Sequence, residues 1–172
     1  MLDLLRQKIR DVPDFPKKGI LFKDITPLLG DPQAFNLAIN LLADRYIGRQ
    51  VDRVVGVEAR GFILGAALAY KLNAGFVLIR KPGKLPSETM KASYALEYGA
   101  DELEIHRDAL TPGLRVLLVD DVIATGGTIR ATTDLVKTLR CEIIEIAFLI
   151  ELSMLKGREK LPDCNVFSLL QY

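Results

Sequence analysis

Two adjacent acidic residues followed by a glycine-containing turn are the feature of this sequence best suited to chemistry. The run RVLLVDDV, residues 115–122, is largely apolar until it reaches Asp120 and Asp121, so it predicts a buried strand that ends in carboxylates. The turn ATGGT, residues 124–128, follows and opens an expected helix over residues 128–139. Ligands of open α/β sheets bind at the carboxyl ends of the strands, so the carboxylates and the turn are expected to face one ligand.

The turn has the composition of a phosphate-binding loop. Its backbone amides, from Ala124 to Thr128, can converge on one anion, and the positive end of the helix dipole favours that anion. Gly126 and Gly127 permit backbone angles closed to other residues and place no side chain against the phosphate. Thr125 can add a hydroxyl donor, as can Thr128. A lysine does not follow the glycines, so the turn is not the P-loop of nucleoside triphosphatases.

The two aspartates require a second kind of ligand group, because carboxylates repel a phosphate. We therefore expect Asp120 and Asp121 to face hydroxyls or a metal. A ribose 5-phosphate supplies both groups at a suitable separation, with its phosphate in the turn and its 2- and 3-hydroxyls on the carboxylates. The alternative is an ordinary helix-capping turn with acidic residues on the surface.

The elements that must position this turn alternate between strands and helices. Strands are expected over residues 53–58, 75–81, 115–122, 142–152 and 166–172, and helices over 2–9, 32–46, 62–72 and 128–139. Residues 12–32 are dense in Pro and Gly and are predicted to form an irregular lead-in, whereas residues 93–99 alternate like a hairpin strand. The alternation predicts one α/β domain over residues 1–172, with a mostly parallel central sheet flanked by helices.

Composition limits the partners of the chain. Lys and Arg number 23 against 22 Asp and Glu, so the net charge of +1 lacks the basic excess of a nucleic-acid binder. The longest nearly apolar stretch, residues 61–70, is about half of the ~20 residues that a membrane-spanning helix needs. The two cysteines, Cys141 and Cys164, are too few for a zinc site or a disulfide framework. We expect a cytoplasmic protein that binds neither nucleic acid nor membrane.

Several blocks of the sequence resemble a single family. VLLVDDVIATGGT, residues 116–128, resembles the ribose-phosphate signature of the type I phosphoribosyltransferases. The blocks FPKKGILFKDITPLL, GVEARGFILG, LIRKPGKLP, ASYALEYG, LKGREKLP and FSLLQY resemble the adenine-specific members, in the same order. The resemblance spans nearly the whole chain and implies the type I phosphoribosyltransferase fold, with a small hood over the active site.

The resemblance also implies a reaction. It is the transfer of ribose 5-phosphate from phosphoribosyl pyrophosphate to N9 of adenine, which gives AMP and pyrophosphate. Mg²⁺ would be held mainly by substrate and water, near Asp120 and Asp121, and no direct protein ligand is expected. A homodimer is implied as well, with the N-terminal helix or the Arg60 region near its interface.

The resemblance assigns pyrophosphate binding to five residues. They lie at or after the ends of the strands expected over residues 53–58 and 75–81. Those residues are Arg60, Arg80, Lys81, Lys84 and Tyr98. In the family the turn before the arginine often contains a non-proline cis peptide, here expected at Ala59–Arg60. Taken singly, each cation is better explained as a solvated surface charge, and only the motif context favours the pyrophosphate role.

The segment ILFKD resembles the base-binding segment of the family. There the carbonyl of Leu21 would accept from the exocyclic amine of adenine, and the amide of Lys23 would donate to N1. A 6-oxopurine presents the opposite pattern at both positions, so this backbone pair would reject it. Phe22 and Val122 would sandwich the ring, although core packing is the alternative for Phe22.

Glu97 and Arg60 are the expected catalytic residues, and Glu97 supplies the carboxylate. Members specific for hypoxanthine and guanine typically carry Asp at the position of Ala124, so in this chain another group must meet N7 of the purine. The resemblance places Glu97 there, on the segment 81–98 that folds over the site, where it would give general acid–base help. The alternative is an exposed strand residue.

Three other functions remain open from the sequence. They are an enzyme of the same fold that acts on xanthine or orotate, a regulator that senses phosphoribosyl pyrophosphate without turnover, and a generic nucleotide-binding α/β module. Ala124, Glu97 and the ILFKD segment argue against the first. The near-neutral charge argues against a DNA-binding regulator. The generic nucleotide-binding module remains an alternative only if the motif match misleads, since fold alone does not fix function.

Overall fold

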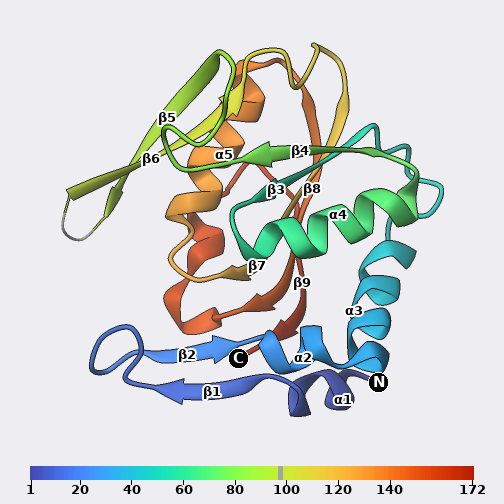
Figure 1. Cartoon of the computed structure of the whole chain (residues 1–172), viewed down its shortest axis with the longest axis vertical. Coiled ribbons are helices and arrows are strands. Elements are labelled where there is room, and N and C mark those ends of the chain that lie inside the picture. The colour runs from blue at the N-terminus through green and yellow to red at the C-terminus, as the bar shows by residue number, and fades with distance from the viewer. Residues whose placement is uncertain (97–98) are drawn as a thin grey trace.

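A five-stranded parallel sheet forms the centre of the molecule (Figure 1). The computed structural model describes residues 1–96 and 99–172. The strands of the sheet, in spatial order, are β4 (Gly75–Ile79), β3 (Arg53–Val57), β7 (Arg115–Ile123), β8 (Glu142–Glu151) and β9 (Val166–Gln171). All four neighbouring pairs are parallel, so the predicted α/β class and the mostly parallel central sheet are confirmed.

Helices connect these strands and cover the sheet. They are α1 (Leu2–Gln7), α2 (Thr26–Gly30), α3 (Pro32–Asp44), α4 (Arg60–Leu72) and α5 (Gly127–Thr138), with two short 3₁₀ turns, η1 (Ser153–Leu155) and η2 (Gly157–Lys160). The start of α3 follows from its sequence. The side chain of Asp31 accepts hydrogen bonds from the amides of Gln33 and Ala34, and Pro32 occupies the first helical position, where its missing N–H costs nothing.

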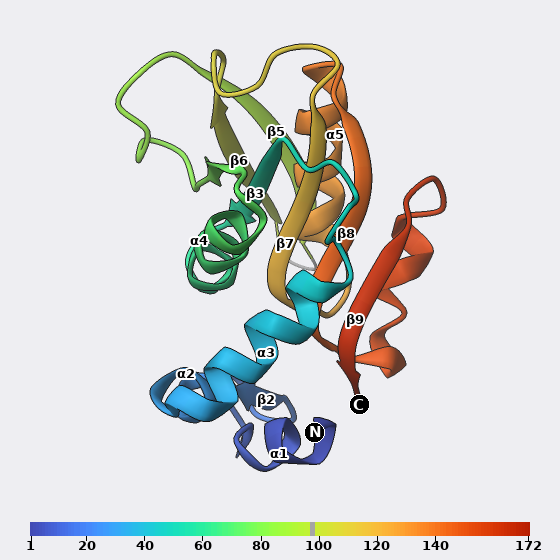
Figure 2. The ribbon, with the colours of Figure 1, turned by 90° about the vertical axis from the view of Figure 1, so that its right-hand side faces the viewer.

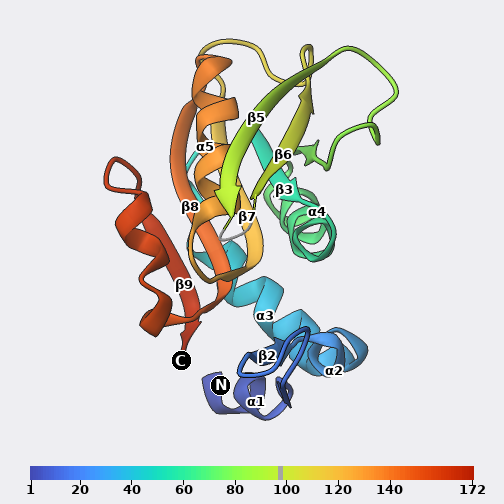
Figure 3. The same ribbon diagram turned by 90° about the vertical axis from the view of Figure 1, so that its left-hand side faces the viewer.

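The two faces of the sheet bury different cores. Successive strand residues point to opposite faces, so Leu117 packs with α3 and α4 while Leu118 packs with α5. Figures 2 and 3 show α4 and α5 on opposite sides of the central strands. The β5–β6 hairpin, β5 (Thr89–Leu96) and β6 (Gly99–His106), packs against α5. It occupies the place of the expected hood.

The prediction of an irregular lead-in over residues 12–32 was wrong in part. The segment contains β2 (Leu21–Asp24) and α2, and β2 pairs antiparallel with β1 (Arg10–Pro13). Neither strand exceeds four residues and one contains a proline, so no alternation long enough to signal a strand exists in the sequence. A contact between the rings of Phe15 and Phe22, with centroids 5.1 Å apart, ties the connecting loop to β2.

Two further predictions need correction near α4. The helix begins at Arg60 rather than at residue 62. The non-proline cis peptide lies at Glu58–Ala59 and not at Ala59–Arg60. The strand expected over residues 93–99 is β5 (Thr89–Leu96), which begins four residues earlier, and the ends of the other predicted elements agree to within two residues. The apolar pattern does not report where backbone hydrogen bonding stops.

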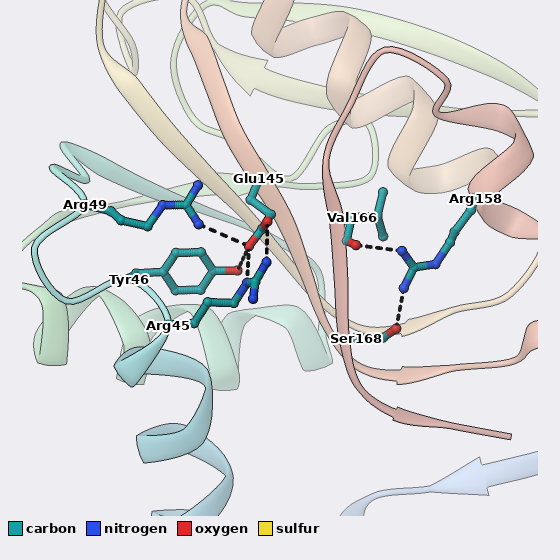
Figure 4. Close-up of polar contacts among 7 residues, drawn as sticks. All are labelled: Arg45, Tyr46, Arg49, Glu145, Arg158, Val166 and Ser168. Atoms are coloured by element: carbon teal, nitrogen blue, oxygen red, sulfur yellow. Dashed lines mark hydrogen bonds and ion pairs between the residues drawn. The ribbon is translucent and has the colours of Figure 1, made fainter.

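A buried glutamate on β8 anchors the end of α3 to the sheet. Glu145 accepts hydrogen bonds from Arg45 at 2.5 and 2.9 Å and from the Tyr46 hydroxyl at 2.8 Å, and Arg49 lies 3.5 Å away (Figure 4). Burial raises the pKa of Tyr46, and its bond to Glu145 adds to the effect. The cluster explains how a charged side chain is tolerated in the interior.

Among the described residues, no helix has both the length and the apolar character needed to cross a bilayer.

Candidate active site

The strand order creates one position where the chain switches direction across the sheet. From β3 the chain passes to β4 on one side, whereas β7 lies on the other side of β3. Loops that leave β3 and β7 therefore diverge at their carboxyl ends, and open α/β sheets bind ligands in the crevice at such a point. The turn at Glu58–Arg60 follows β3, and the turn after Ile123 follows β7, so both belong to this crevice region.

An ion pair joins the two strand ends. The Arg60 guanidinium donates to the Asp121 carboxylate, whose side chain is almost fully buried. The guanidinium carbon also lies 5.0 Å from the centroid of the Phe22 ring, a cation–π geometry. Arg60 thus connects α4, β7 and the β1–β2 hairpin, and the predicted pyrophosphate, ribose and base residues meet at one place.

Asp120 and Asp121 differ in their electrostatic situation. Burial raises the pKa of Asp120 well above its ordinary value, and the neighbouring Asp121 charge raises it further. Asp121 has Arg60 as its partner, whereas Asp120 accepts from the Asp121 amide at 2.9 Å. Gly61 makes this close packing possible, because a Cβ there would lie 2.8 Å from an Asp120 carboxylate oxygen. A ligand that donates to Asp120 would therefore relieve unbalanced negative charge.

Residues 124–128, here called the phosphate loop, open α5 as predicted. Gly126 precedes the helix in the left-handed conformation, with φ of +78°, which explains the need for glycine. The Thr128 hydroxyl lies 3.5 Å from the hydroxyl of Tyr94 on β5, so the hairpin reaches the loop. The sequence of the loop contains no lysine, so its anion-binding groups are amides and hydroxyls.

Glu58 gathers the basic residues that follow β4. Its carboxylate accepts from Arg80 Nε at 2.9 Å, from Lys84 Nζ at 2.8 Å and from the Lys81 amide at 3.1 Å. Burial alone would raise the pKa of Glu58, but these hydrogen bonds outweigh it and the pKa is lowered. Arg80 and Lys84, two of the expected pyrophosphate residues, are thus held together by a carboxylate that the sequence analysis did not single out.

Lys81 points to a different partner. Its ammonium lies 3.1 Å from Asp101 on β6, and this hydrogen bond raises the pKa of Lys81. Asp101 also accepts from the Tyr94 hydroxyl at 3.1 Å. The predicted residues Glu97 and Tyr98 lie outside the described residues, so their roles stay predictions.

The expected base-binding segment forms strand β2 beside the crevice. Leu21 is 49% exposed, while the Lys23 ammonium is 2.6 Å from Asp11 and 4.0 Å from the centroid of the Tyr172 ring. The Lys23 side chain is therefore held between β1 and the C-terminal residue. Val122 is partly buried against the core on the α3–α4 side of the sheet.

Sequence reasoning missed three residues of this region. Glu58 binds Arg80, Gly61 packs closely against Asp120, and the Tyr94 hydroxyl lies next to that of Thr128. Glu58 had a detectable signal, because it is a carboxylate at a strand end, two residues before Arg60 and beside an expected anion site. Tyr94 had none, since its contact depends on how the hairpin packs.

Among residues 1–96 and 99–172, no group of three or more His, Cys, Asp or Glu side chains is arranged to hold a metal ion.

The model of the phosphoribosyl transferase domain family matches residues 30–170 of the chain. The chain is also 62% identical over 172 residues to the adenine phosphoribosyltransferase of Pelobacter propionicus, with all of both chains covered. The chain belongs to the adenine phosphoribosyltransferase family. The predicted family and the predicted type I phosphoribosyltransferase fold are therefore confirmed.

Solved structures of adenine phosphoribosyltransferases have the same fold. The enzyme from Thermoanaerobacter pseudethanolicus superposes with a TM-score of 0.97 at 53% identity, with 100% of both chains covered. The enzyme from Saccharomyces cerevisiae, solved with an imino-altritol bisphosphate and adenine, has a TM-score of 0.91 at 43% identity and covers 98% of this chain and 97% of its own.

Replacement of Asp120 by asparagine should stabilise the protein while it impairs sugar-phosphate use. The raised pKa means that the folded protein binds a proton more tightly than the unfolded chain, so stability falls as pH rises from about the ordinary value of 3.8 toward the raised value. Asp120→Asn does not lose stability in this way. Each 1 kcal/mol of unfolding free energy that the variant gains over wild type would raise the thermal midpoint by roughly 2–4 °C for a chain of this size.

Thermal midpoints of wild type and Asp120→Asn, measured from pH 4 to pH 8, test this expectation. The gain should grow with pH, and Asp163→Asn, at an exposed aspartate, should show no such trend. A variant that is less stable than wild type across the whole range would contradict the electrostatic account of Asp120.

Proposed function

We infer that the chain catalyses the reaction of its family, the transfer of ribose 5-phosphate from phosphoribosyl pyrophosphate to N9 of adenine to give AMP and pyrophosphate. The observation that supports it most directly is the meeting of three predicted subsites around Arg60. That residue contacts Asp121 and the Phe22 ring, and it follows directly on the turn whose Glu58 holds Arg80 and Lys84.

The phosphate loop holds the 5-phosphate, and the two aspartates hold the ribose. Five successive residues place amides at the start of α5, where the helix dipole favours an anion. The ribose hydroxyls donate to Asp120 and Asp121, and the raised pKa of Asp120 marks a carboxylate whose charge its surroundings do not balance. Both ends of the sugar phosphate are thereby fixed, so the anomeric carbon is held for attack.

Pyrophosphate is received by the cations at the ends of β3 and β4. Glu58 holds Arg80 and Lys84 side by side, and Asp121 holds Arg60, which lies two residues after Glu58 in the chain. A pyrophosphate that enters this cluster competes with Glu58 for Arg80 and Lys84. Lys81 can join after it leaves Asp101, and Tyr98 is proposed to line the same side.

A divalent cation fits this donor set. Asp120 and Asp121 offer hard oxygen ligands beside the place of the ribose hydroxyls, and the raised pKa of Asp120 shows negative charge that a bound cation would offset. These two carboxylates would face hydrated Mg²⁺ without forming a dedicated cage. When bound, Mg²⁺ neutralises charge on the pyrophosphate as it departs.

Adenine is read by the backbone of β2 and stacked between apolar side chains. The Leu21 carbonyl accepts from the exocyclic amine, and the Lys23 amide donates to N1, while the Lys23 side chain is bound to Asp11. Phe22 and Val122 flank the ring. Phe22 also contacts Arg60, so closure of the base site is coupled to the pyrophosphate site.

Glu97 is proposed to act at N7 of the purine. The β5–β6 hairpin that carries it approaches the phosphate loop through the Tyr94–Thr128 contact. A carboxylate at N7 sets the proton arrangement that N9 needs for attack. Since Ala124 has no polar side chain, the phosphate loop itself cannot supply this group.

A homodimer is proposed on the basis of α4. Its outward face carries exposed apolar side chains at helical spacing, with Ile63 44% and Tyr70 88% exposed and Ala66 between them. Such a stripe on a helix next to Arg60 fits a second copy of the chain better than solvent. Sedimentation equilibrium gives the stoichiometry directly.

Base selectivity tests the proposed reaction. Protein, phosphoribosyl pyrophosphate and Mg²⁺ are mixed separately with adenine, hypoxanthine, guanine, xanthine or orotate, and pyrophosphate release is measured. We expect turnover with adenine and a kcat/KM for hypoxanthine lower by roughly 10⁴-fold, because a 6-oxopurine leaves both backbone groups mismatched. Equal use of hypoxanthine would refute recognition by the Leu21 and Lys23 backbone.

The role of Glu97 is tested by Glu97→Leu, with Glu102→Leu on the same hairpin as the control. We expect kcat of Glu97→Leu to fall by about 10²–10⁴-fold, the usual worth of general acid–base help, with little change in KM for phosphoribosyl pyrophosphate. Glu102→Leu should keep kcat near the wild-type value. If kcat of Glu97→Leu stays unchanged, the residue is an ordinary strand residue.

A further inference from the structure

The segment between β8 and β9 is fixed to the start of the phosphate loop. Glu151, the last residue of β8, lies beside Ile123, the last residue of β7, in the parallel register. The Leu152 amide donates to the Ile123 carbonyl at 3.0 Å. The chain that continues from β8 through η1 and η2 therefore begins where the phosphate loop begins.

Two glycine backbones pack against each other at this place. A Cβ on Gly157 would lie 2.4 Å from the Ala124 carbonyl oxygen and 3.1 Å from the Gly126 amide nitrogen. In return, a Cβ on Gly126 would lie 2.4 Å from the Gly157 carbonyl oxygen. Real Cβ contacts are not this short, so neither residue can carry a side chain without displacing the other. The Gly157 backbone thereby limits where the Ala124 carbonyl and the Gly126 amide can lie.

Arg158 holds this contact in place from the next residue. Its guanidinium makes two hydrogen bonds of 2.6 Å to Glu151. It also donates to the Val166 carbonyl at 2.6 Å and to the Ser168 hydroxyl at 2.7 Å (Figure 4). The bidentate pairing with a mostly buried carboxylate is the strongest geometry available to arginine. Arg158 ties η2 to both β8 and β9, so Gly157 cannot move away from the phosphate loop alone.

The other end of η2 is linked to α5. Arg130, in the first turns of that helix, donates to the Lys160 carbonyl at 3.3 Å, and its amide donates to the Gly126 carbonyl at 3.0 Å. The loop and the first turn of α5 are thus braced by the same short segment at two points. The side chains that make these contacts differ from those that face a substrate in the proposed function.

We propose that Gly157 and Arg158 are positioning residues for the phosphate loop: the Arg158–Glu151 ion pair presses the Gly157 backbone against Ala124 and Gly126 and so fixes the amides that receive the 5-phosphate. The proposal rests on the proposed function of the loop. It concerns the phosphate end of the ligand, because η2 contacts the phosphate loop, α5, β8 and β9, whereas the base is read at β2.

The affinity for AMP compared with that for adenosine isolates this effect, since the two ligands differ only in the 5-phosphate. Dissociation constants are measured by calorimetry. If adenosine binds too weakly for a direct titration, its dissociation constant is measured by competition with AMP. In Arg158→Ala we expect AMP to bind about tenfold more weakly, the worth of one impaired hydrogen bond to a charged group, with adenosine affinity changed by less than about twofold.

Arg45→Ala is the matched control. Arg45 and Arg158 are both bidentate to a mostly buried glutamate of β8, and their side chains are 40% and 39% exposed. Arg45 binds Glu145 and lies over the Phe167 ring. Both arginines thus tie a neighbouring segment to β8 and β9, but only Arg158 directly follows a residue, Gly157, that packs against the phosphate loop. The loss of Arg45 should lower the unfolding midpoint by a similar amount and leave the ratio of adenosine to AMP dissociation constants at the wild-type value.

Gly157→Ala decides the question if Arg158→Ala does not fold. This variant keeps the ion pair but pushes a methyl group against Ala124, so it should weaken AMP binding and spare adenosine. The proposal is overturned if the foldable variant leaves the ratio unchanged, or if Arg45→Ala lowers it equally. A wild-type protein that binds adenosine as tightly as AMP would instead contradict the proposed function of the loop.

Discussion

The ion pair between Arg60 and Asp121 is the interaction on which the arrangement of the site depends. It spans the crevice between the carboxyl ends of β3 and β7, the point where the strand order reverses. Because the guanidinium also lies over the Phe22 ring, one side chain connects residues of the proposed base, ribose and pyrophosphate subsites. A buried carboxylate is tolerated at the end of β7 only because this partner reaches it.

Charge pairing prepares the remaining subsites. Glu58 holds Arg80 and Lys84, and Asp101 holds Lys81, so the cations that would meet an anionic leaving group are already gathered before any ligand binds. Asp120 is the exception, because burial and the Asp121 charge raise its pKa. That imbalance agrees with the proposed role of Asp120 as an acceptor for the ribose hydroxyls.

The sequence predicted most of the sheet and the phosphate loop, because both depend on local patterns. An apolar strand, two acids and a glycine turn opening a helix are recognisable without knowledge of their neighbours, and the structure places them together. The β1–β2 hairpin was not predicted, since its short strands have no repeat to detect. Glu58, Tyr94 and Gly157 matter through partners 22 or more residues away, and spacing alone does not report such contacts.

A crystal structure of the protein with AMP tests the central claim most directly. We predict the 5-phosphate within hydrogen-bonding distance of amides in residues 124–128, with both ribose hydroxyls on Asp120 and Asp121. A well-ordered AMP whose phosphate lies on Arg80 and Lys84, or anywhere else on the surface, with the amides of the loop unengaged, would contradict this prediction.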